Sequence, residues 1–137
     1  MAVLIDASIL IEVERGRLEL EPHVVQRQDE EFFLSVITAS ELLHGVHRAV
    51  QVEVRTKRAA FVEGILERFP LLPVDLATAR AHAQVWAELM AAGRMIGPHD
   101  LWLAAPCIAH GLTMVTANVR EFVRVPGLQV EVWGGPG

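Results

Sequence analysis

Short apolar segments alternate with longer helical patterns along this chain, and that alternation restricts its fold more than any other feature. The apolar segments are too short for helices and are rich in valine, isoleucine and phenylalanine, which is typical of buried strands. Five strands are predicted, at residues 2–5, 32–36, 71–74, 112–116 and 129–133. Six helices are predicted, at residues 7–16, 22–29, 38–49, 52–68, 76–92 and 99–110. Strands separated by helices favour an α/β fold, with a mainly parallel central sheet of about five strands and helices on both faces.

The length of the chain, 137 residues, fits one domain with a single core. We expect that domain at residues 1–134, followed by a flexible, glycine-rich tail at 135–137. No apolar run approaches the roughly 18 residues that cross a bilayer, and no basic segment precedes the first apolar run, so neither a membrane span nor a signal peptide is expected. The single cysteine, Cys107, excludes an intrachain disulfide and fits a cytoplasmic protein.

Acidic residues stand where the predicted strands end or the predicted helices begin. Asp6 directly follows the first strand, Glu41 and Asp100 lie in the first turns of two helices, and Asn118 and Glu121 follow the fourth strand. Helix starts that follow parallel strands lie at the same edge of the sheet as the carboxyl ends of those strands, where α/β proteins bind ligands. We therefore expect these side chains to converge on one cleft.

Several carboxylates in one cleft repel one another, and a hard divalent cation relieves that repulsion. Oxygen ligands suit Mg²⁺ or Mn²⁺. The chemistry that follows is activation of water and stabilisation of charge at a phosphoryl centre. The net charge of −5 argues against nucleic-acid binding through bulk electrostatics, but bound cations reverse the sign of the charge locally.

Each of these polar residues also has a purely structural interpretation. Asp6 can cap the first helix, Glu41 can form a capping box with Thr38, and Asp100 can be stabilised by a helix dipole. Asn118 is equally at home in a turn. Only the joint pattern favours a metal site.

Four segments stand out, at residues 3–8, 38–42, 96–105 and 112–122. In order and spacing they resemble the PIN domain, and more closely the VapC toxins of bacterial and archaeal toxin–antitoxin pairs. The resemblance implies a PIN fold and an endoribonuclease that depends on Mg²⁺ or Mn²⁺. By likeness, Asp6, Glu41 and Asp100 are the metal-binding acids, and Asn118 or Glu121 completes the metal shell. Asn118 is neutral and Glu121 is longer than the aspartate common in the family. The segments are Val3-Leu4-Ile5-Asp6-Ala7-Ser8, Thr38-Ala39-Ser40-Glu41-Leu42, Ile96 to Ala105 with Pro98-His99-Asp100, and Leu112 to Phe122 with Thr116-Ala117-Asn118.

The same resemblance implies partners: an RNA substrate, a small VapB-like antitoxin, and a second copy of the chain, giving a homodimer and a heterotetramer or larger assembly with the antitoxin. Trp86, Leu89 and Met90 have the helical spacing of a core or of a dimer interface. The family alone implies the antitoxin, because no motif in this chain identifies it.

Five further residues are predicted to contact RNA. Ser8 and Thr116 stand beside the acids and can hydrogen-bond a ligand or a phosphate. Arg94, Arg120 and Arg124 lie in segments that flank the expected cleft, so we expect them at RNA phosphates. The basic run around Arg55 and Arg58, by contrast, has the composition of a solvated helix face.

Three other functions compete with the nuclease. Phosphoryl transfer through an aspartyl phosphate is disfavoured because the only lysine, Lys57, lies in a helix. A nucleotide-binding module is disfavoured because no glycine-rich loop follows the first strand. A non-catalytic PIN-like module that binds RNA or protein remains the alternative, since the neutral Asn118 weakens the expected acidic site.

Overall fold

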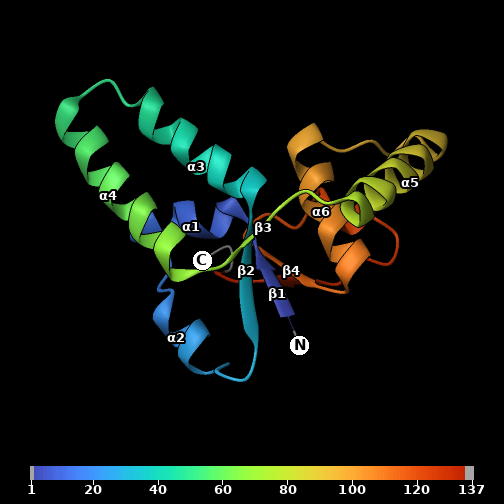
Figure 1. Ribbon diagram of the computed structural model, residues 1–137, viewed down its shortest axis with the longest axis horizontal. Helices are drawn as coiled ribbons and strands as arrows, with labels where there is room; N and C mark the ends of the chain where they lie inside the picture. Colours follow the sequence, from blue (N-terminus) through green and yellow to red (C-terminus); the bar gives the residue numbers. More distant parts are fainter. Residues whose placement is uncertain (1, 135–137) are drawn as a thin grey trace.

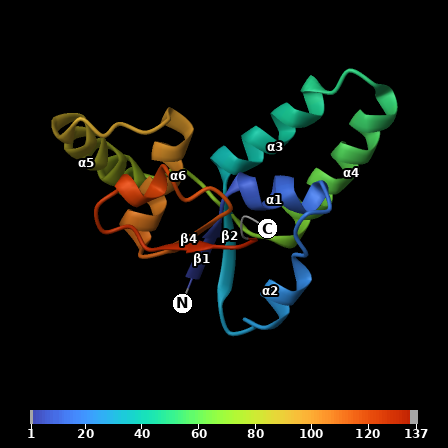
Figure 2. The same cartoon turned by 180° about the vertical axis from the view of Figure 1, so that it is seen from behind.

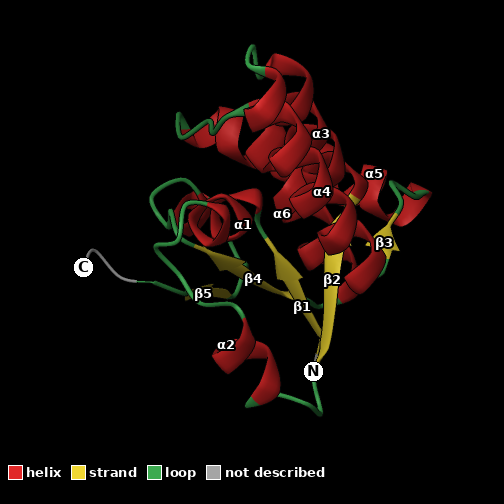
Figure 3. Cartoon of the chain, turned by 90° about the vertical axis from the view of Figure 1, so that its left-hand side faces the viewer, coloured by secondary structure: helices red, strands yellow, loops and turns green. Residues whose placement is uncertain are grey.

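Five parallel strands form the centre of the structure, a computed structural model that describes residues 2–134 (Figure 1). The strands lie in the order β3-β2-β1-β4-β5, as the view along the sheet shows (Figure 3). Every pair of neighbouring strands is parallel, so the predicted fold class is confirmed. The strands are β1 (Ala2–Ile5), β2 (Glu31–Ser35), β3 (Leu71–Leu72), β4 (Thr113–Thr116) and β5 (Val130–Val132).

Six α-helices cover both faces of this sheet. Helices α1, α3 and α4 pack on one face, where α2 adds Val24 to the same apolar cluster, and α5 and α6 pack on the other. The α3–α4 hairpin and the α5–α6 pair project on opposite sides of the sheet in both the front and the back view (Figures 1 and 2). The helices are α1 (Ala7–Glu14), α2 (Glu21–Val25), α3 (Val36–Arg48), α4 (Val52–Arg68), α5 (Leu76–Ala92) and α6 (Pro98–His110), with a short 3₁₀ helix, η1, at Phe122–Arg124.

Strand β1 is apolar at every position because both of its faces are covered. Val3 and Ile5 point into the cluster under α1, α3 and α4, whereas Leu4 points into the cluster under α5 and α6. Side chains alternate between the faces of a strand, so a strand buried on both faces needs an uninterrupted apolar run. That requirement makes the charged Asp6, which comes next in the chain, conspicuous.

The carboxyl end of β1 lies where the strand order reverses. From β1 the chain proceeds to β2 and β3 on one side, while β4 and β5 lie on the other. The amide of Asp6 donates to the Val115 carbonyl oxygen (2.8 Å), so Asp6 is held against β4 at this point. Crevices at such reversals are the usual ligand sites of parallel sheets.

Helix α3 begins earlier than predicted, and the predicted capping box is wrong. Ser35, the last residue of β2, is the N-cap, and its hydroxyl oxygen accepts a hydrogen bond from the Ile37 amide (3.0 Å). Thr38 is fully buried inside the helix, and Glu41 lies beyond the first turn. Both Ser35 and Thr38 are good caps, and the sheet, which ends at Ser35, decides between them.

Other boundaries differ by a few residues. Helix α2 is shorter than the predicted 22–29. Strand β3 ends before Pro73 and lies at the edge of the sheet, as that proline predicted. Helix α6 continues through the buried Pro106, so the kink expected there stays a prediction. Cys107 is buried and unpaired within residues 2–134.

No helix within residues 2–134 is long and apolar enough to cross a membrane. The predicted tail at 135–137 falls outside the described residues.

Candidate active site

Asp6 is a buried carboxylate held by two hydroxyl groups from different elements. Only 6% of its surface is exposed. Ser8 Oγ, in α1, donates to Asp6 Oδ2 (2.7 Å), and Thr116 Oγ1, at the end of β4, donates to the same oxygen (2.9 Å). Both of these hydrogen bonds go to Oδ2, and none is made to the other oxygen, Oδ1, within residues 2–134. Asp6 occupies the N-cap position of α1, as the capping interpretation predicted, but its side chain makes no capping hydrogen bond to the helix.

The two hydroxyls are themselves fixed by the loop that leaves β4. The Ala117 amide donates to Ser8 Oγ (3.0 Å), and the Asn118 amide donates to Thr116 Oγ1 (2.9 Å). Thr116 is completely buried. Ser8 and Thr116, predicted as contacts to RNA, therefore orient Asp6 in this structure.

Glu41 projects toward the same edge from the second turn of α3. One of its oxygens, Oε1, is buried without a hydrogen-bond partner among the described residues. His99 Nδ1 lies 3.7 Å from this oxygen, which is too far for a hydrogen bond. Burial raises the pKa of Glu41, and the charges of Asp6 and Asp100 raise it further, while His99 lowers it.

Asp100 completes the group of acids from the first turn of α6. Burial raises its pKa to about 6, and the charges of Asp6 and Glu121 act in the same direction against the lowering effect of His99. Glu121 lies close by, and its Oε2 accepts a hydrogen bond from the Gly97 amide at the start of α6 (3.1 Å). Glu121 thus steadies the segment that carries Asp100. The charges of Asp6 and Asp100 act on Glu41, and those of Asp6 and Glu121 act on Asp100, as expected for acids at one edge of the sheet.

The remaining predicted residues occupy different places around this edge. Asn118 and Arg120 are exposed and line a hollow beside Ser8. Arg94 is exposed in the loop before α6. Arg124 donates to the Met95 carbonyl oxygen (2.9 Å), so it holds that loop.

The acids fit a divalent cation in donor type and charge. They offer only oxygen ligands, they repel one another, and Glu41 Oε1 is a buried acceptor without a donor. Within residues 2–134, however, no three acidic, histidine or cysteine side chains are close enough to hold one ion as they are placed. Mg²⁺ commonly binds through one or two carboxylates and several waters, so a tighter cluster is not required.

A groove whose lining holds three arginines and two glutamates, one of them Glu41, was not predicted from the sequence. It has a volume of about 560 Å³, lies between α1, α3 and α4, and has Arg15, Arg48 and Arg58 in its lining. Arg58 donates to Glu14 (2.9 Å) and to the Gly45 carbonyl oxygen (3.0 Å), which ties α4 to α1 and α3. The interpretation of Arg55, Lys57 and Arg58 as a solvated helix face therefore fails at Arg58 only, because Arg55 and Lys57 are exposed. The lining of the groove comes from residues far apart in the sequence, so no local pattern predicts the groove.

The family model of the PIN domain matches residues 3–128 of the chain. The chain belongs to the PIN domain family. It is 35% identical over 130 residues to Ribonuclease VapC1 of Rickettsia felis, with 95% of each protein covered. It is 37% identical over 100 residues to the tRNA(fMet)-specific endonuclease VapC of Salmonella typhimurium, which covers 73% of this chain and 74% of that protein. These relatives place it among the VapC PIN domains.

The fold agrees with solved structures of that group. A chain in the crystal structure of DNA-bound VapBC from Salmonella typhimurium matches with a TM-score of 0.88 at 29% identity, over 97% of this chain and 98% of the other. The resemblance to PIN domains and VapC proteins is confirmed over nearly the whole chain.

Proposed function

We propose that this VapC-type PIN domain is a metal-dependent endoribonuclease whose active site is the group Asp6, Glu41 and Asp100. The observation that carries the proposal is the buried Asp6, fixed by Ser8 and Thr116 at the reversal of strand order, with two acids of raised pKa beside it. A buried carboxylate with a free oxygen is costly unless it serves a ligand.

The chain's own residues have distinct roles in this proposal. Asp6 is the rigid ligand, because two hydroxyls fix one of its oxygens. Glu41 and Asp100 supply the remaining carboxylates, and Glu121, whose charge acts on Asp100, completes the shell. A divalent cation held there supplies charge neutralisation at the phosphodiester and a lowered pKa for water. Glu121 also accepts a hydrogen bond from the Gly97 amide and so holds the start of α6.

The substrate class follows from the relatives. The Salmonella typhimurium relative is named as specific for tRNA(fMet), which makes initiator tRNA the first substrate to test. The test is cleavage of purified initiator tRNA in Mg²⁺, in Mn²⁺ and in chelator, with calorimetric titration of the metal on the same protein. Cleavage only with metal supports the proposal, whereas cleavage that survives chelator contradicts it.

The partner is a VapB-like antitoxin, on the strength of solved neighbours that are VapBC complexes. Affinity capture of a tagged Asp6→Asn chain, expressed from its own locus, should recover a small DNA-binding protein in stoichiometric amount. Recovery of the chain alone contradicts this assignment.

Self-association is proposed through α5, which is apolar on two faces. Val85 and Leu89 face the core, whereas Leu76, Trp86 and Met90 are 66%, 47% and 61% exposed. Leu76 and Met90 are two heptads apart, and Trp86 lies one turn before Met90, so the exposed side chains form a stripe. A second copy of the chain would pack the same stripe of its own α5 against this one across a two-fold axis.

A non-catalytic module that binds RNA or protein is the second candidate. Asn118 favours this candidate, because its side chain is neutral and adds no negative charge to the group of acids. Metal binding without cleavage of any RNA would support this candidate over the nuclease.

A further inference from the structure

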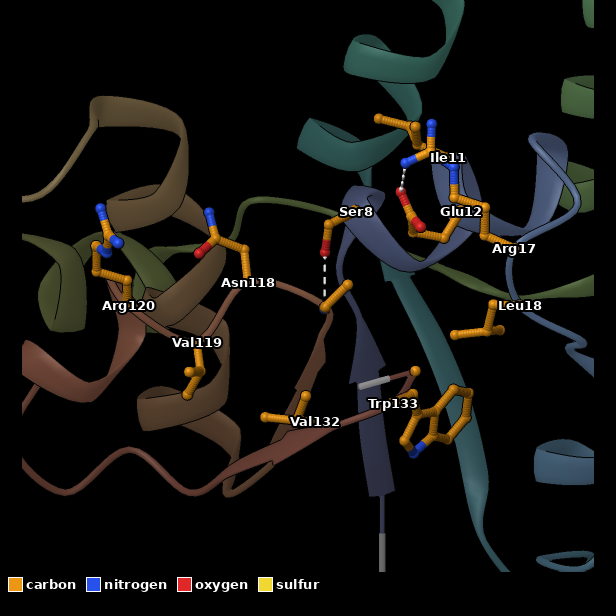
Figure 4. A pocket seen from close by; sticks show the side chains of 12 residues that line it. Ser8, Ile11, Glu12, Arg17, Leu18, Asn118, Val119, Arg120, Val132 and Trp133 are labelled. Carbon is orange, nitrogen blue, oxygen red and sulfur yellow. Dashed lines mark hydrogen bonds and ion pairs between the residues drawn. The ribbon is translucent and has the colours of Figure 1, made fainter. Parts of the chain in front are cut away.

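A hollow of about 830 Å³ lies between α1 and the segment that leaves β4 (Figure 4). Ser8 lines it, and the Ser8 hydroxyl donates to Asp6 and accepts from the Ala117 amide. A group bound in the hollow that contacts Ser8 is therefore linked to Asp6 through the hydrogen bond between Ser8 and Asp6. The volume is typical of sites that hold small organic groups.

The floor of the hollow is apolar and rigid. It includes Leu18, Val132 and Trp133. Trp133 is almost completely buried and is fixed by stacking on His23, with 4.3 Å between ring centroids. Val132, in contrast, is 47% exposed although it lies in a strand. A flat aromatic group would cover this floor.

The rim of the hollow offers hydrogen bonds and one unpaired positive charge. The Asn118 amide side chain and the Arg120 guanidinium make no hydrogen bond or ion pair with the rest of residues 2–134, and Figure 4 shows them on the same side. On the opposite side Arg17 and Glu12 pair with each other (3.6 Å) and cancel in charge. A side-chain amide can pair with the edge of a nucleobase, and a guanidinium can contact a phosphate.

We propose that this hollow binds one unpaired nucleobase of an RNA strand, in the nucleotide that adjoins the cleaved phosphodiester. Asn118 contacts the base edge, Arg120 contacts the phosphate, and Val132 packs against the base face. The proposal rests on the proposed nuclease function and deepens it. Proteins recognise unpaired bases through hydrogen bonds to the base edge and through packing of the base face against aromatic or apolar side chains.

The first test fills the hollow. Val132→Trp should lower kcat/KM on a single-stranded RNA library by about tenfold or more, the effect of losing one packed base, and should change the base preference at the cleavage site. Val123→Trp is the matched control, because Val123 is 61% exposed on η1 and lies outside the hollow. Unchanged kcat/KM and base preference in Val132→Trp would overturn the proposal.

A second variant tests the rim without filling the hollow. Arg120→Ala should weaken RNA binding and reduce the slope of log affinity against log salt by about one, as expected for the loss of one phosphate contact. Arg80→Ala, on the exposed side of α5, should leave that slope unchanged. Equal slopes in Arg120→Ala and wild type contradict the role of Arg120.

A third measurement does not depend on cleavage. Single-stranded RNA containing 4-thiouridine is crosslinked to the Asp6→Asn chain, and the adducts are mapped by mass spectrometry. Adducts at Val132, Trp133 or Asn118 support the hollow even if the nuclease assignment fails. Adducts confined to the groove between α1, α3 and α4 would overturn the proposal. A Val132→Trp variant that loses its protein partner but keeps its RNA affinity would overturn it as well.

Discussion

At the residue scale, the site depends on a carboxylate that the fold could not bury without compensation. Asp6 accepts two hydroxyl hydrogen bonds on one oxygen, and each donor is fixed in turn by a main-chain amide. Ionised groups inside proteins are tolerated only when they are paired in this way or bound to a ligand. Ser8 and Thr116 therefore determine where Asp6 points, and no contact with the substrate is needed to explain them.

Removing one hydroxyl tests this arrangement. Thr116→Val deletes the donor to Asp6 and the acceptor of the Asn118 amide, so the free energy of unfolding should fall by about 1–3 kcal/mol and cleavage should slow. Thr113→Val, at the other end of the same strand, is the matched control, since its hydroxyl reaches only Gln129 (3.3 Å). Chemical denaturation measures both variants, and equal losses in the two would contradict a special role for Thr116.

The raised pKa of Asp100 predicts a pH dependence of the metal-free protein. Its pKa rises from 3.8 to about 6 on folding, so between these values the folded chain binds more protons than the unfolded chain. The free energy of unfolding should therefore fall as pH rises from 3.8 to about 6, and it should fall no further above that pH on account of Asp100. Asp100→Asn should remove that loss, whereas Glu53→Gln, in exposed α4, should not. Thermal unfolding in chelator from pH 4 to 7.5 measures it, and an unchanged pH profile in Asp100→Asn would refute the assignment.

The same shift couples protons to the cation. Below about pH 6 a proton occupies Asp100, so the apparent affinity for Mg²⁺ should weaken as pH falls from 7 to 5. Calorimetric titration at several pH values measures the effect. An affinity independent of pH would show that Asp100 does not contribute to metal binding.

At the scale of elements, the sequence pattern predicted most of the fold. Apolar runs and helix-ending glycines located the strands and the long helices, and Gly93 and Gly111 adopt the left-handed conformation with φ of 67° and 68°. Ends set by tertiary contacts were harder to predict. The start of α3 depends on where β2 stops pairing with β1 and β3, which no local pattern contains.

The candidate site was predictable in its acids and unpredictable in its supports. Asp6, Glu41 and Asp100 could be assigned to one sheet edge because strand ends and helix starts share that edge. The hydrogen bond from Thr116 to Asp6 joins residues that are 110 positions apart, and the ion pair of Arg58 with Glu14 joins residues that are 44 positions apart. Such contacts follow from packing, and side-chain types in sequence do not specify them.

The corrected start of α3 gives a prediction at this scale. Ser35→Ala removes the acceptor of the Ile37 amide and should lower the free energy of unfolding by about 1 kcal/mol. Ser40→Ala, at an exposed position within the same helix, should be neutral or slightly stabilising because alanine favours helices. Denaturant unfolding separates the two, and a neutral Ser35→Ala would contradict the assigned cap.

At the scale of the whole molecule, the exposed stripe on α5 predicts self-association. Trp86→Glu and Met90→Glu place charges on that stripe and should shift the chain from dimer to monomer in sedimentation velocity. Val52→Glu, on exposed α4, is the control, because Val52 is 70% exposed and lies on a different helix. A wild-type chain that sediments as a monomer would contradict the proposed interface.

The central claim is that Asp6 anchors a metal-dependent ribonuclease site, and the most direct test is to map RNA cleavage ends after expression of wild type and of Asp6→Asn. Asn keeps the shape of the side chain, so Asp6→Asn should fold like wild type by circular dichroism. We predict discrete new RNA ends with wild type and none with Asp6→Asn. The same ends at the same level in both strains would contradict the account.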